Sequence, residues 1–417
     1  MDIYGINYND YLNYFQNNEN IYENEYKYGS GNYESFSNPN NLMEAFKSCR
    51  KDVNWKDSVQ RYGINELKNT MNLHQQIENE TYKEDPIHEF TLAERGHIRD
   101  IKAHTVKDRV VQRSFNDNVL LPRIRNQLIY DNGASLKNKG ISFSRNRFEI
   151  HLRSAYQEFN GEFYVLLIDF SKFFDNILHQ QLLNMFQCYL NEYEFKFLTQ
   201  FIHEFEIDVS YMSDEEFDSS LNILFNSLEY SKIKNKYDLD GSKMLRKSVG
   251  IGNQISQISG LYYPHEIDNY CKICKSIKYY GRYMDDSYIF LKTKEELHAL
   301  LKEINEICIK LGIFVNFNKT KIIKSSNIIP YLKINYKFKD TGGLIRIISS
   351  ETIRREYRKI TKYKNLLDNG KCNLNDIVNW YKSWRGNYIK YDSKSKIYKL
   401  DFYMINLFNL DKDFIKK

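Results

Sequence analysis

The chain has 417 residues, of which 42% are hydrophobic and 27% are charged. This length allows two or three packed subdomains, and the composition is ordinary for a water-soluble globular protein. No stretch approaches about 18 consecutive apolar residues, and the N-terminal region lacks a basic-then-apolar leader pattern, which argues against a membrane span or secretion. We therefore expect a cytoplasmic protein with no membrane partner.

Charge is distributed unevenly along the chain, although the formal net charge is only +6. Residues 319–417 contain 23 Lys and Arg against 9 Asp and Glu, a net charge of +14, which leaves −8 for residues 1–318. A basic C-terminal quarter beside an acidic remainder favours binding of a phosphate backbone by one subdomain. The 34 Tyr and 26 Phe either stack on the bases of such a partner or reflect a low-GC genome.

The six cysteines are scattered along the chain. Only Cys271 and Cys274 lie close together, and no second Cys or His pair follows at the spacing of a zinc site. We expect reduced thiols, as is usual in the cytoplasm.

In chain order, the first expected element is an Asn- and Tyr-rich arm over residues 1–60, irregular or partly helical. Helical patterns and turns alternate over residues 64–157. The apolar run Phe163–Ile168 ends at an acid, Asp169, and predicts a buried strand. Residues 178–190 predict a helix behind that strand.

The second half of the chain adds a hairpin and a long helix. Seven acids between residues 204 and 218 predict a solvated insertion. Strand-like patterns over residues 279–291 flank Met284-Asp285-Asp286 and predict a β-hairpin with acids at its turn. Residues 294–311 predict a helix that ends at Gly312. Its apolar face comprises Leu297, Leu300, Leu301, Ile304, Ile307, Cys308 and Leu311. The order strand, helix, hairpin, helix predicts an α+β fold with helices on one face of a sheet.

The acids at the expected strand ends, Asp169, Asp285 and Asp286, are candidate metal ligands. Phosphoryl transfer to a 3′-hydroxyl uses two divalent cations about 3.5–4 Å apart. Mg²⁺ accepts a few carboxylates together with waters and substrate phosphates. A single strand-end Asp is more often a cap or turn residue, but two adjacent acids repel each other unless a cation compensates them.

Several segments resemble the sequence boxes of reverse transcriptases. Tyr283-Met284-Asp285-Asp286 resembles the Tyr-x-Asp-Asp box of that family, and residues 169–177 resemble its first catalytic box as found in group II introns, retrons and bacterial relatives. Four more segments match in the expected order. They are residues 98–112 in the fingers, residues 250–257 in the dNTP- and template-contacting box, residues 312–320 in the box with an Asn and a Lys, and residues 383–386 in a thumb motif.

The resemblance implies an RNA-directed DNA polymerase that adds dNTPs on an RNA template, by a two-metal mechanism with two Mg²⁺ ions or with Mn²⁺ in their place. Asp169 and Asp285 would bridge the metals, Asp286 would be a supporting acid, and Phe170 is assigned to both the metal and the nucleotide site. Lys319 would orient or protonate the pyrophosphate, unless it is simply a solvated lysine.

The resemblance also assigns the nucleotide site. Arg99 would pair with the incoming triphosphate through its planar guanidinium, with Arg95 as a second candidate. Phe174 stands where the family places the ring that excludes a ribose 2′-hydroxyl, although it could be a plain core residue. The dNTP- and template-contacting box supplies the remaining candidates, Gly252, Ser256 and Gln257.

Two positions depart from the family pattern. Ile251 replaces the Gln that many members carry before Gly252, which is the form associated with diversity-generating retroelements and some anti-phage reverse transcriptases. Lys333 stands where the primer-gripping box usually has Gly. We expect an anti-phage enzyme that uses a dedicated, structured non-coding RNA, with a diversity-generating retroelement as the alternative. The acidic insertion and the modest net charge favour the first.

The implied architecture is a right-hand polymerase with fingers, palm and thumb. We expect an arm at 1–60, fingers at 61–160, a palm at 161–345 with an acidic insertion at about 204–247, and a helical, basic thumb at 346–417. A catalytically silent RNA-binding scaffold and a template-independent nucleotidyl transferase are the rival functions, and oligomerisation stays open.

Overall fold

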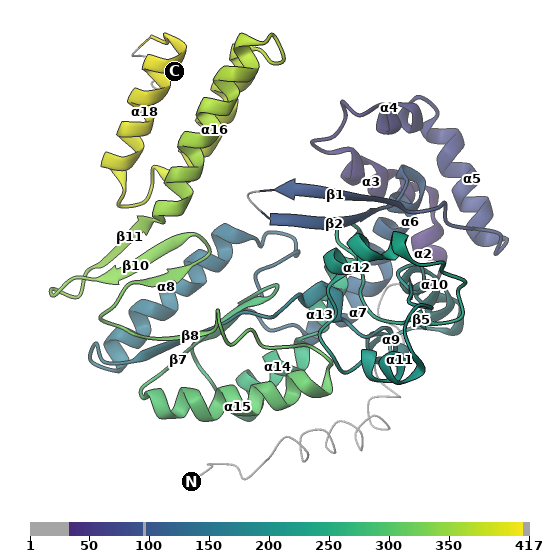
Figure 1. The fold of residues 1–417 in the computed structure, drawn as a ribbon, viewed down its shortest axis with the longest axis horizontal. Helices are drawn as coiled ribbons and strands as arrows, with labels where there is room; N and C mark the ends of the chain where they lie inside the picture. The colour runs from purple at the N-terminus through teal and green to yellow at the C-terminus, as the bar shows by residue number, and fades with distance from the viewer. Residues whose placement is uncertain (1–32, 95–96, 412–417) are drawn as a thin grey trace. The chain divides into compact units, whose positions relative to one another are not determined.

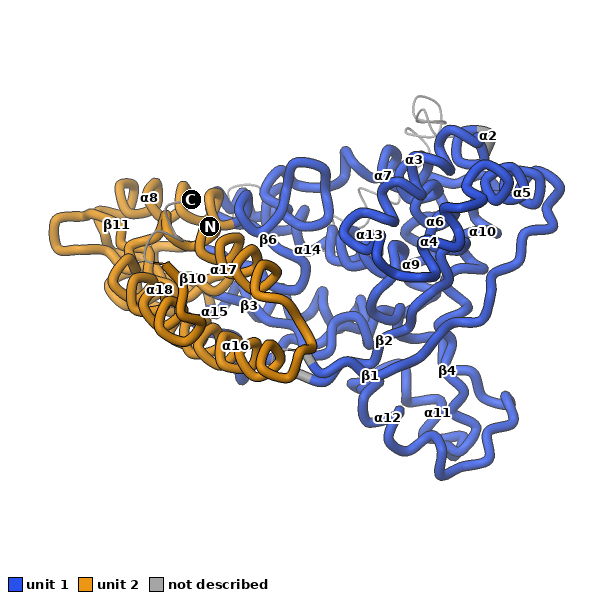
Figure 2. The backbone as a smooth tube through the Cα atoms, turned by 90° about the horizontal axis from the view of Figure 1, so that it is seen from above, with its two compact units in different colours: residues 1–144, 167–289, 298–321 blue, residues 145–166, 290–297, 322–417 orange. Residues whose placement is uncertain are grey.

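The computed structural model describes residues 33–94 and 97–411, and mixes helices with small antiparallel sheets as the α+β prediction requires (Figure 1). Contacts divide the chain into two compact units (Figure 2). The first comprises Met1–Ser144, Leu167–Ile289 and His298–Lys321. The second comprises Arg145–Leu166, Phe290–Leu297 and Ile322–Lys417.

The first unit begins with four helices, of which the first two fall within the expected arm. These are α2 (Tyr33–Ser37), α3 (Pro39–Arg50), α4 (Asp57–Ile64) and α5 (Glu66–Glu78). Phe36 of α2 is fully buried, and its ring lies 5.2 Å from the rings of both Phe115 and Phe197. The described part of the arm is therefore helical and packed into the core. Residues 1–32 lie outside the described residues.

An antiparallel hairpin and a kinked helix follow. Strands β1 (His88–Glu94) and β2 (His97–Ala103) pair in register, with Leu92 opposite Arg99. Thr105 caps α6 (Val106–Phe115) by accepting a hydrogen bond from the Asp108 amide. The helix continues through a π-turn, η1 (Asn116–Leu120), into α7 (Leu121–Ile124) and η2 (Arg125–Gln127).

The central sheet has the strand order β6-β7-β3-β8. Its strands are β3 (Tyr164–Ile168), β6 (Tyr280–Tyr283), β7 (Asp286–Leu291) and β8 (Lys321–Lys324). The expected buried strand before Asp169 and the expected hairpin are both confirmed. Tyr283 pairs with Asp286, so Met284 and Asp285 form a two-residue turn.

The helices around this sheet follow the apolar patterns of the sequence. They are α9 (His179–Gln187), α10 (Glu192–His203), α13 (Gln254–Tyr262), α14 (His265–Asn269), the π-turn η5 (Tyr270–Cys274) and α15 (Lys294–Lys310). All seven residues of the predicted apolar face of α15 are buried. Gly312 has φ +69°, the left-handed conformation that ends a helix at low cost.

The acidic segment is folded more fully than its charge suggests. It contains β4 (Ile207–Asp208), α11 (Asp214–Ser220), α12 (Ser227–Ile233), η4 (Lys234–Lys236) and β5 (Met244–Leu245). A small apolar cluster of its own is built on Ile207, Val209 and Leu245. Glu204 and Glu206 are partly buried, which corrects the expectation of a solvated run of acids.

A buried ion pair lies beneath the hairpin turn. The Arg282 guanidinium donates to both carboxylate oxygens of Asp268, at 2.8 and 2.6 Å, and both side chains are almost fully buried. It also donates to the carbonyl oxygens of Gly260, Leu261 and Met284 at 2.8–3.2 Å. One side chain therefore ties β6 to the end of α13 and to the turn that carries Asp285.

The second unit contains most of α8 (Ile141–Glu158), a three-stranded sheet and three helices. The sheet has the order β11-β10-β9, with β9 (Ile329–Tyr331), β10 (Ile334–Phe338) and β11 (Leu344–Ile348). The helices are α16 (Ser350–Asp368), α17 (Leu374–Tyr388) and α18 (Lys394–Phe408), with α16 and α18 side by side. Within the thumb-like motif, Arg385 pairs with the buried Asp401 of α18 at 2.9 Å.

The turn between β9 and β10 is strained. Leu332 and Lys333 have φ values of 43° and 72°, the left-handed region that a two-residue hairpin turn requires and that Gly or Asn usually fills. Arg145 donates from Nε and Nη2 to the Leu332 carbonyl oxygen, and the Ser349 amide donates to that of Lys333. These hydrogen bonds hold the turn in place.

Within the described residues, no helix is long and apolar enough to cross a bilayer.

Replacing Arg282 with Met is expected to lower the free energy of unfolding by about 3–5 kcal/mol, because it leaves the Asp268 carboxylate buried without its cation. Arg282→Lys keeps the charge but cannot reach all of the carbonyl groups, so its loss should be smaller. Denaturant unfolding followed by circular dichroism measures both. Equal losses in the two variants would show that the buried charge is not the dominant interaction.

Candidate active site

The three candidate acids come together because the strands that carry them are neighbours. Asp169 directly follows β3, Asp285 occupies the β6–β7 turn, and Asp286 is the first residue of β7. Strands β3 and β7 are adjacent in the sheet. The end of β3 and the hairpin turn therefore present their carboxylates to one another, as the sequence patterns predicted.

The backbone of Asp169 is fixed by the loop that leads to Lys319. The Asp169 carbonyl oxygen accepts a hydrogen bond from the Asn316 amide at 2.8 Å, and the Asp169 amide donates to Thr320 Oγ1 at 3.4 Å. Phe170 forms an isolated antiparallel bridge with Val315, and its side chain is buried. The Phe170 side chain therefore belongs to the core, which leaves only its backbone as a possible part of the site.

Lys319 approaches the acids from solvent. Its Nζ lies 3.5 Å from Asp169 Oδ2, and its side chain is 67% exposed. Oδ2 of Asp169 is buried and has no hydrogen-bond donor among the described residues. A buried carboxylate oxygen without a donor is unfavourable unless a cation binds it, because burial removes its water.

The charges of the three acids interact. Exclusion of water by the surrounding protein raises the pKa of Asp286 to about 7, with the charges of Asp285 and Asp169 adding to the shift, although Asp286 retains solvent exposure. The pKa of Asp285 is also raised, first by burial and then by Asp169, while Lys319 and Arg99 oppose the shift. The Arg99 guanidinium of β2 is therefore within electrostatic range of Asp285.

These observations fit a divalent-metal site. Three carboxylates repel one another, one buried oxygen lacks a donor, and the lysine at 3.5 Å is too exposed to compensate all three charges. Mg²⁺ prefers such a partial set of carboxylates, completed by water and substrate phosphate.

Phe174 faces this site from the 3₁₀ turn η3 (Phe173–Asn176). It is half-buried, and its ring packs on Gly260 of α13, where an added Cβ would lie 2.8 Å from Phe174 Cε1 and 3.5 Å from Met284 Sδ. The absence of a side chain at Gly260 thus determines where the Phe174 ring sits, close to the Met284–Asp285 turn. Sequence reasoning missed Gly260.

The acidic insertion contacts the same turn. Asp175 accepts hydrogen bonds from the Ser227 amide and hydroxyl at 3.1 and 2.9 Å, and α12 continues to Ser231, which donates to Asp100 at 2.6 Å. Asp100 is next to Arg99 in β2. Helix α12 therefore connects the turn that bears Phe174 with the strand that bears Arg99, a link that the sequence did not predict.

The three candidates of the dNTP- and template-contacting box, at the start of α13, lie in different surroundings. Gly252 has φ +116°, a conformation that side chains rarely adopt. The Ser256 side chain is buried, and its hydroxyl donates to the Val249 carbonyl oxygen. Gln257 is exposed. Gly252 and Gln257 are therefore exposed to solvent, whereas the Ser256 side chain stabilises the loop that precedes α13.

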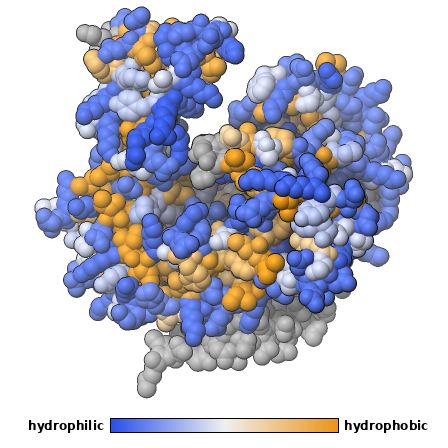
Figure 3. All heavy atoms as spheres, in the orientation of Figure 1, coloured by the Kyte–Doolittle hydropathy of each residue, from blue (hydrophilic) through white to orange (hydrophobic). Residues whose placement is uncertain are grey.

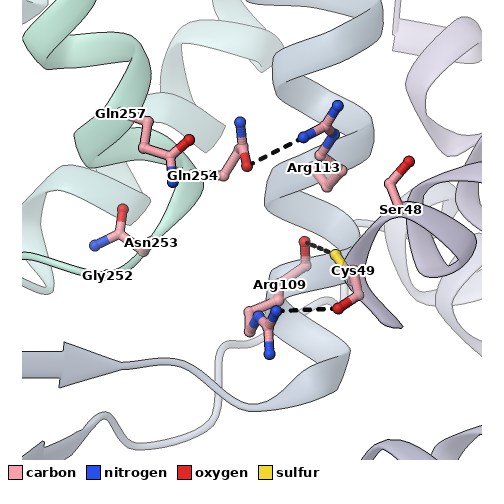
Figure 4. Close-up of a pocket in the computed structure, with 8 residues that line it drawn as sticks. All are labelled: Ser48, Cys49, Arg109, Arg113, Gly252, Asn253, Gln254 and Gln257. Carbon is pink, nitrogen blue, oxygen red and sulfur yellow. Dashed lines mark hydrogen bonds between the residues drawn. The ribbon is translucent and has the colours of Figure 1, made fainter. Parts of the chain in front are cut away.

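Gly252 and Gln257 line a pocket of about 120 Å³ beside α6 (Figure 4). Arg109 and Arg113 of α6 face it, and Arg113 donates to Gln254 at 3.5 Å. Arg113 also pairs with Asp117 at 2.5 Å, as the local salt-bridge alternative predicts. The remaining lining residues are Ser48, Cys49, Asn253 and Gln254. The pocket is polar and basic, which suits a phosphate or a polar base edge.

One predicted residue cannot be placed. Arg95, the second candidate for the triphosphate, lies outside the described residues.

A protein-family model described as reverse transcriptase (RNA-dependent DNA polymerase) matches residues 83–336, more than half of the chain. The protein is therefore an enzyme, a nucleotidyltransferase. It belongs to the reverse transcriptase family and is an RNA-directed DNA polymerase, which copies an RNA template into DNA from dNTPs. Members of this family generally use divalent metal ions such as Mg²⁺. A search of curated proteins found no match.

Proposed function

We propose that the protein adds dNTPs by a two-metal mechanism in which Asp169, Asp285 and Asp286 hold two Mg²⁺ ions. The observation that carries this proposal is the meeting of the three acids at the ends of adjacent strands, with a buried Asp169 oxygen that lacks a donor. When bound, the ions lower the pKa of the primer 3′-hydroxyl and neutralise charge on the leaving pyrophosphate.

The chain's own residues then have distinct roles in our proposal. Asp169 and Asp285 would hold the two ions, with the Phe170 carbonyl as a candidate backbone ligand, and Asp286 would add negative charge beside them. Lys319, which is 67% exposed and lies 3.5 Å from Asp169, would bind the pyrophosphate. Arg99 lies on the hairpin within range of Asp285 and pairs with the triphosphate through its guanidinium.

We propose Phe174 as the residue that selects the sugar. Its ring is held by Gly260 near the acids, so a ribose 2′-hydroxyl would meet the ring. The basic pocket of Figure 4 supports a template contact by Gln257 with Arg109 and Arg113.

We also propose that residues 61–160 act as fingers, 161–345 as palm and 346–417 as thumb. Helix α16 supports the last assignment, because Arg354, Arg358 and Lys362 recur every fourth residue on one exposed face. These three form no ion pair within the described part of the chain, and the visible face of α16 and α18 is largely hydrophilic (Figure 3). Such a basic row suits a nucleic-acid backbone.

For the biological setting, we propose anti-phage defence with a dedicated non-coding RNA as template. The Ile251-Gly252 pattern is compatible with both settings, and support for defence comes from the acidic insertion and the modest net charge of +6, since retroelement enzymes of the diversity-generating kind tend to be compact and strongly basic. Sequencing of the RNA that copurifies with the protein separates the alternatives: one structured RNA favours defence, and RNA from a variable repeat favours a diversity-generating retroelement.

The double variant Asp285→Asn, Asp286→Asn should abolish dNTP incorporation on an RNA template, because the metals lose two ligands. Without metal, its melting temperature should equal or exceed that of the wild type, since two mutually repelling acids are removed. Primer extension and a thermal melt in chelator measure the two effects. Full incorporation by a folded double variant would refute the proposed site, and incorporation without RNA would favour a template-independent transferase.

Phe174→Ala should admit rNTPs while dNTP use falls only modestly. Gly260→Ala is the matched variant, because it keeps the ring but displaces it from its present position, and should lower the use of dNTPs without admitting rNTPs. Single-nucleotide incorporation with each substrate gives the ratios. If both folded variants discriminate as the wild type does, the ring belongs to the core alone.

Replacing Arg354, Arg358 and Lys362 with Gln should lower the slope of log affinity against log salt by about 2–3, since each phosphate contact contributes roughly 0.7–0.9. A charge-matched control replaces Lys47, Lys196 and Lys324, each of which pairs with a Glu. Filter binding of an RNA–DNA duplex at several salt concentrations measures the slope. An equal change of the slope in both triple variants would show that Arg354, Arg358 and Lys362 do not contact the nucleic-acid backbone more than other lysines do.

A further inference from the structure

A second polar cluster lies away from the proposed active site, at the base of the β1–β2 hairpin. Glu84 lies between α5 and β1, His104 follows β2, and Glu204 caps the C-terminal end of α10. One potential ligand atom from each of these residues lies within 4.8 Å of the others. Three separate segments of the first unit therefore meet at this cluster.

The His104 ring is the most informative member. Its side chain has no solvent exposure, and neither ring nitrogen has a hydrogen-bond partner within the described residues. Nδ1 lies 3.4 Å from Glu204 Oε2, and the ring is held edge-on against Phe205 with centroids 5.7 Å apart. The buried ring nitrogens are therefore available as ligand atoms at the cluster.

The two glutamates face each other. Both Glu84 oxygens and Glu204 Oε2 are buried, and the two carboxyl groups are close enough to share a proton in a hydrogen bond. A cation bound in the cluster would take the place of that proton. The nearby Lys107 is engaged elsewhere, because its Nζ lies 2.6 Å from Asp85 and 3.6 Å from Asp108.

The wall of the cluster is also polar. Gln112 of α6 is fully buried, and its amide lies beside the Glu84 carboxyl group. Buried polar groups in a folded protein are almost always paired with protein, water or an ion. The two buried carboxyl groups and the His104 ring, whose nitrogens have no hydrogen-bond partner within the described residues, converge on one point, as a bound cation requires.

We propose that Glu84, His104 and Glu204 bind one divalent transition-metal ion, with Zn²⁺ the best match. An imidazole nitrogen with two carboxylates is a zinc ligand set, whereas Mg²⁺ and Ca²⁺ prefer oxygen ligands alone. A dication neutralises the two carboxylates, and the Gln112 amide or a water can take the fourth position. The ion would join the base of the hairpin that carries Arg99 to helix α10.

The test uses the full-length, untagged protein after removal of metals. Zn²⁺ binding is measured by competition with a chromogenic chelator, and also in the Asp285→Asn, Asp286→Asn background to separate the two sites. We expect one equivalent of Zn²⁺ in both proteins and a rise in melting temperature on binding. Glu204→Gln should weaken binding more than about tenfold, since loss of even an outer partner of a ligand costs that much.

Glu204→Gln is suited to the test because it removes a buried charge and should fold at least as well as the wild type without metal. Glu206→Gln is the matched control, two residues away and paired with Arg246 at 2.9 Å, and should bind Zn²⁺ as the wild type does. Co²⁺ should give the visible absorption of a low-coordinate site in the control but not in Glu204→Gln. Absence of binding, equal affinity in Glu204→Gln, or loss of binding in the Asp285→Asn, Asp286→Asn protein would each overturn the site.

The proposed link between the base of the β1–β2 hairpin and α10 can be tested separately from metal binding. Amide hydrogen exchange over residues 84–104 should slow when Zn²⁺ binds and should not change in Glu204→Gln. Zinc binding without this protection would overturn the structural role.

Discussion

The buried guanidinium of Arg282 is the interaction on which the arrangement of the polymerase site depends. It neutralises Asp268 and at the same time occupies the carbonyl oxygens of Met284, Gly260 and Leu261. The turn that presents Asp285 and the glycine that positions the Phe174 ring are thereby fixed to one planar group. Burying two charges is costly unless the geometry satisfies their hydrogen bonds, and here several donors of the guanidinium are used. These hydrogen bonds hold the backbone beneath the acids against the mutual repulsion of their carboxylates.

Local sequence patterns predicted the elements that carry the acids but not the contacts that orient them. The apolar run before Asp169 and the alternation around Asp285 each have one strong interpretation, because a buried strand and a tight hairpin place apolar residues in regular order. Nothing in that periodicity distinguishes a buried Arg282 from a solvated one, since its partner Asp268 lies in another element. For the same reason the sequence could not show that the Ser256 hydroxyl donates to the Val249 carbonyl oxygen and does not face a substrate.

Glu204 illustrates a second reason why sequence patterns could not predict part of the structure. A run of acids in sequence indicates solvent exposure on average, yet the first acid of this run caps α10 and turns inward beside His104. Glu84, His104 and Glu204 are separated by 20 and 100 residues, so no short sequence motif predicts that they form a cluster. Clusters assembled from distant segments become visible only when burial and unsatisfied atoms are known. The insertion is similar, because its small core around Val209 rests on pairing between β4 and β5 across more than thirty residues.

The strained turn at Leu332–Lys333 has a consequence for how this position can vary. A side chain in the left-handed conformation costs about 1 kcal/mol in the folded protein, whereas glycine costs a similar amount through the greater freedom of the unfolded chain. These two costs nearly cancel, so folding stability is almost indifferent to whether Lys or Gly stands at residue 333. With Arg145 fixing the preceding carbonyl, the turn keeps its shape in either case. Selection at this position therefore acts on what the lysine side chain contacts rather than on the stability of the turn.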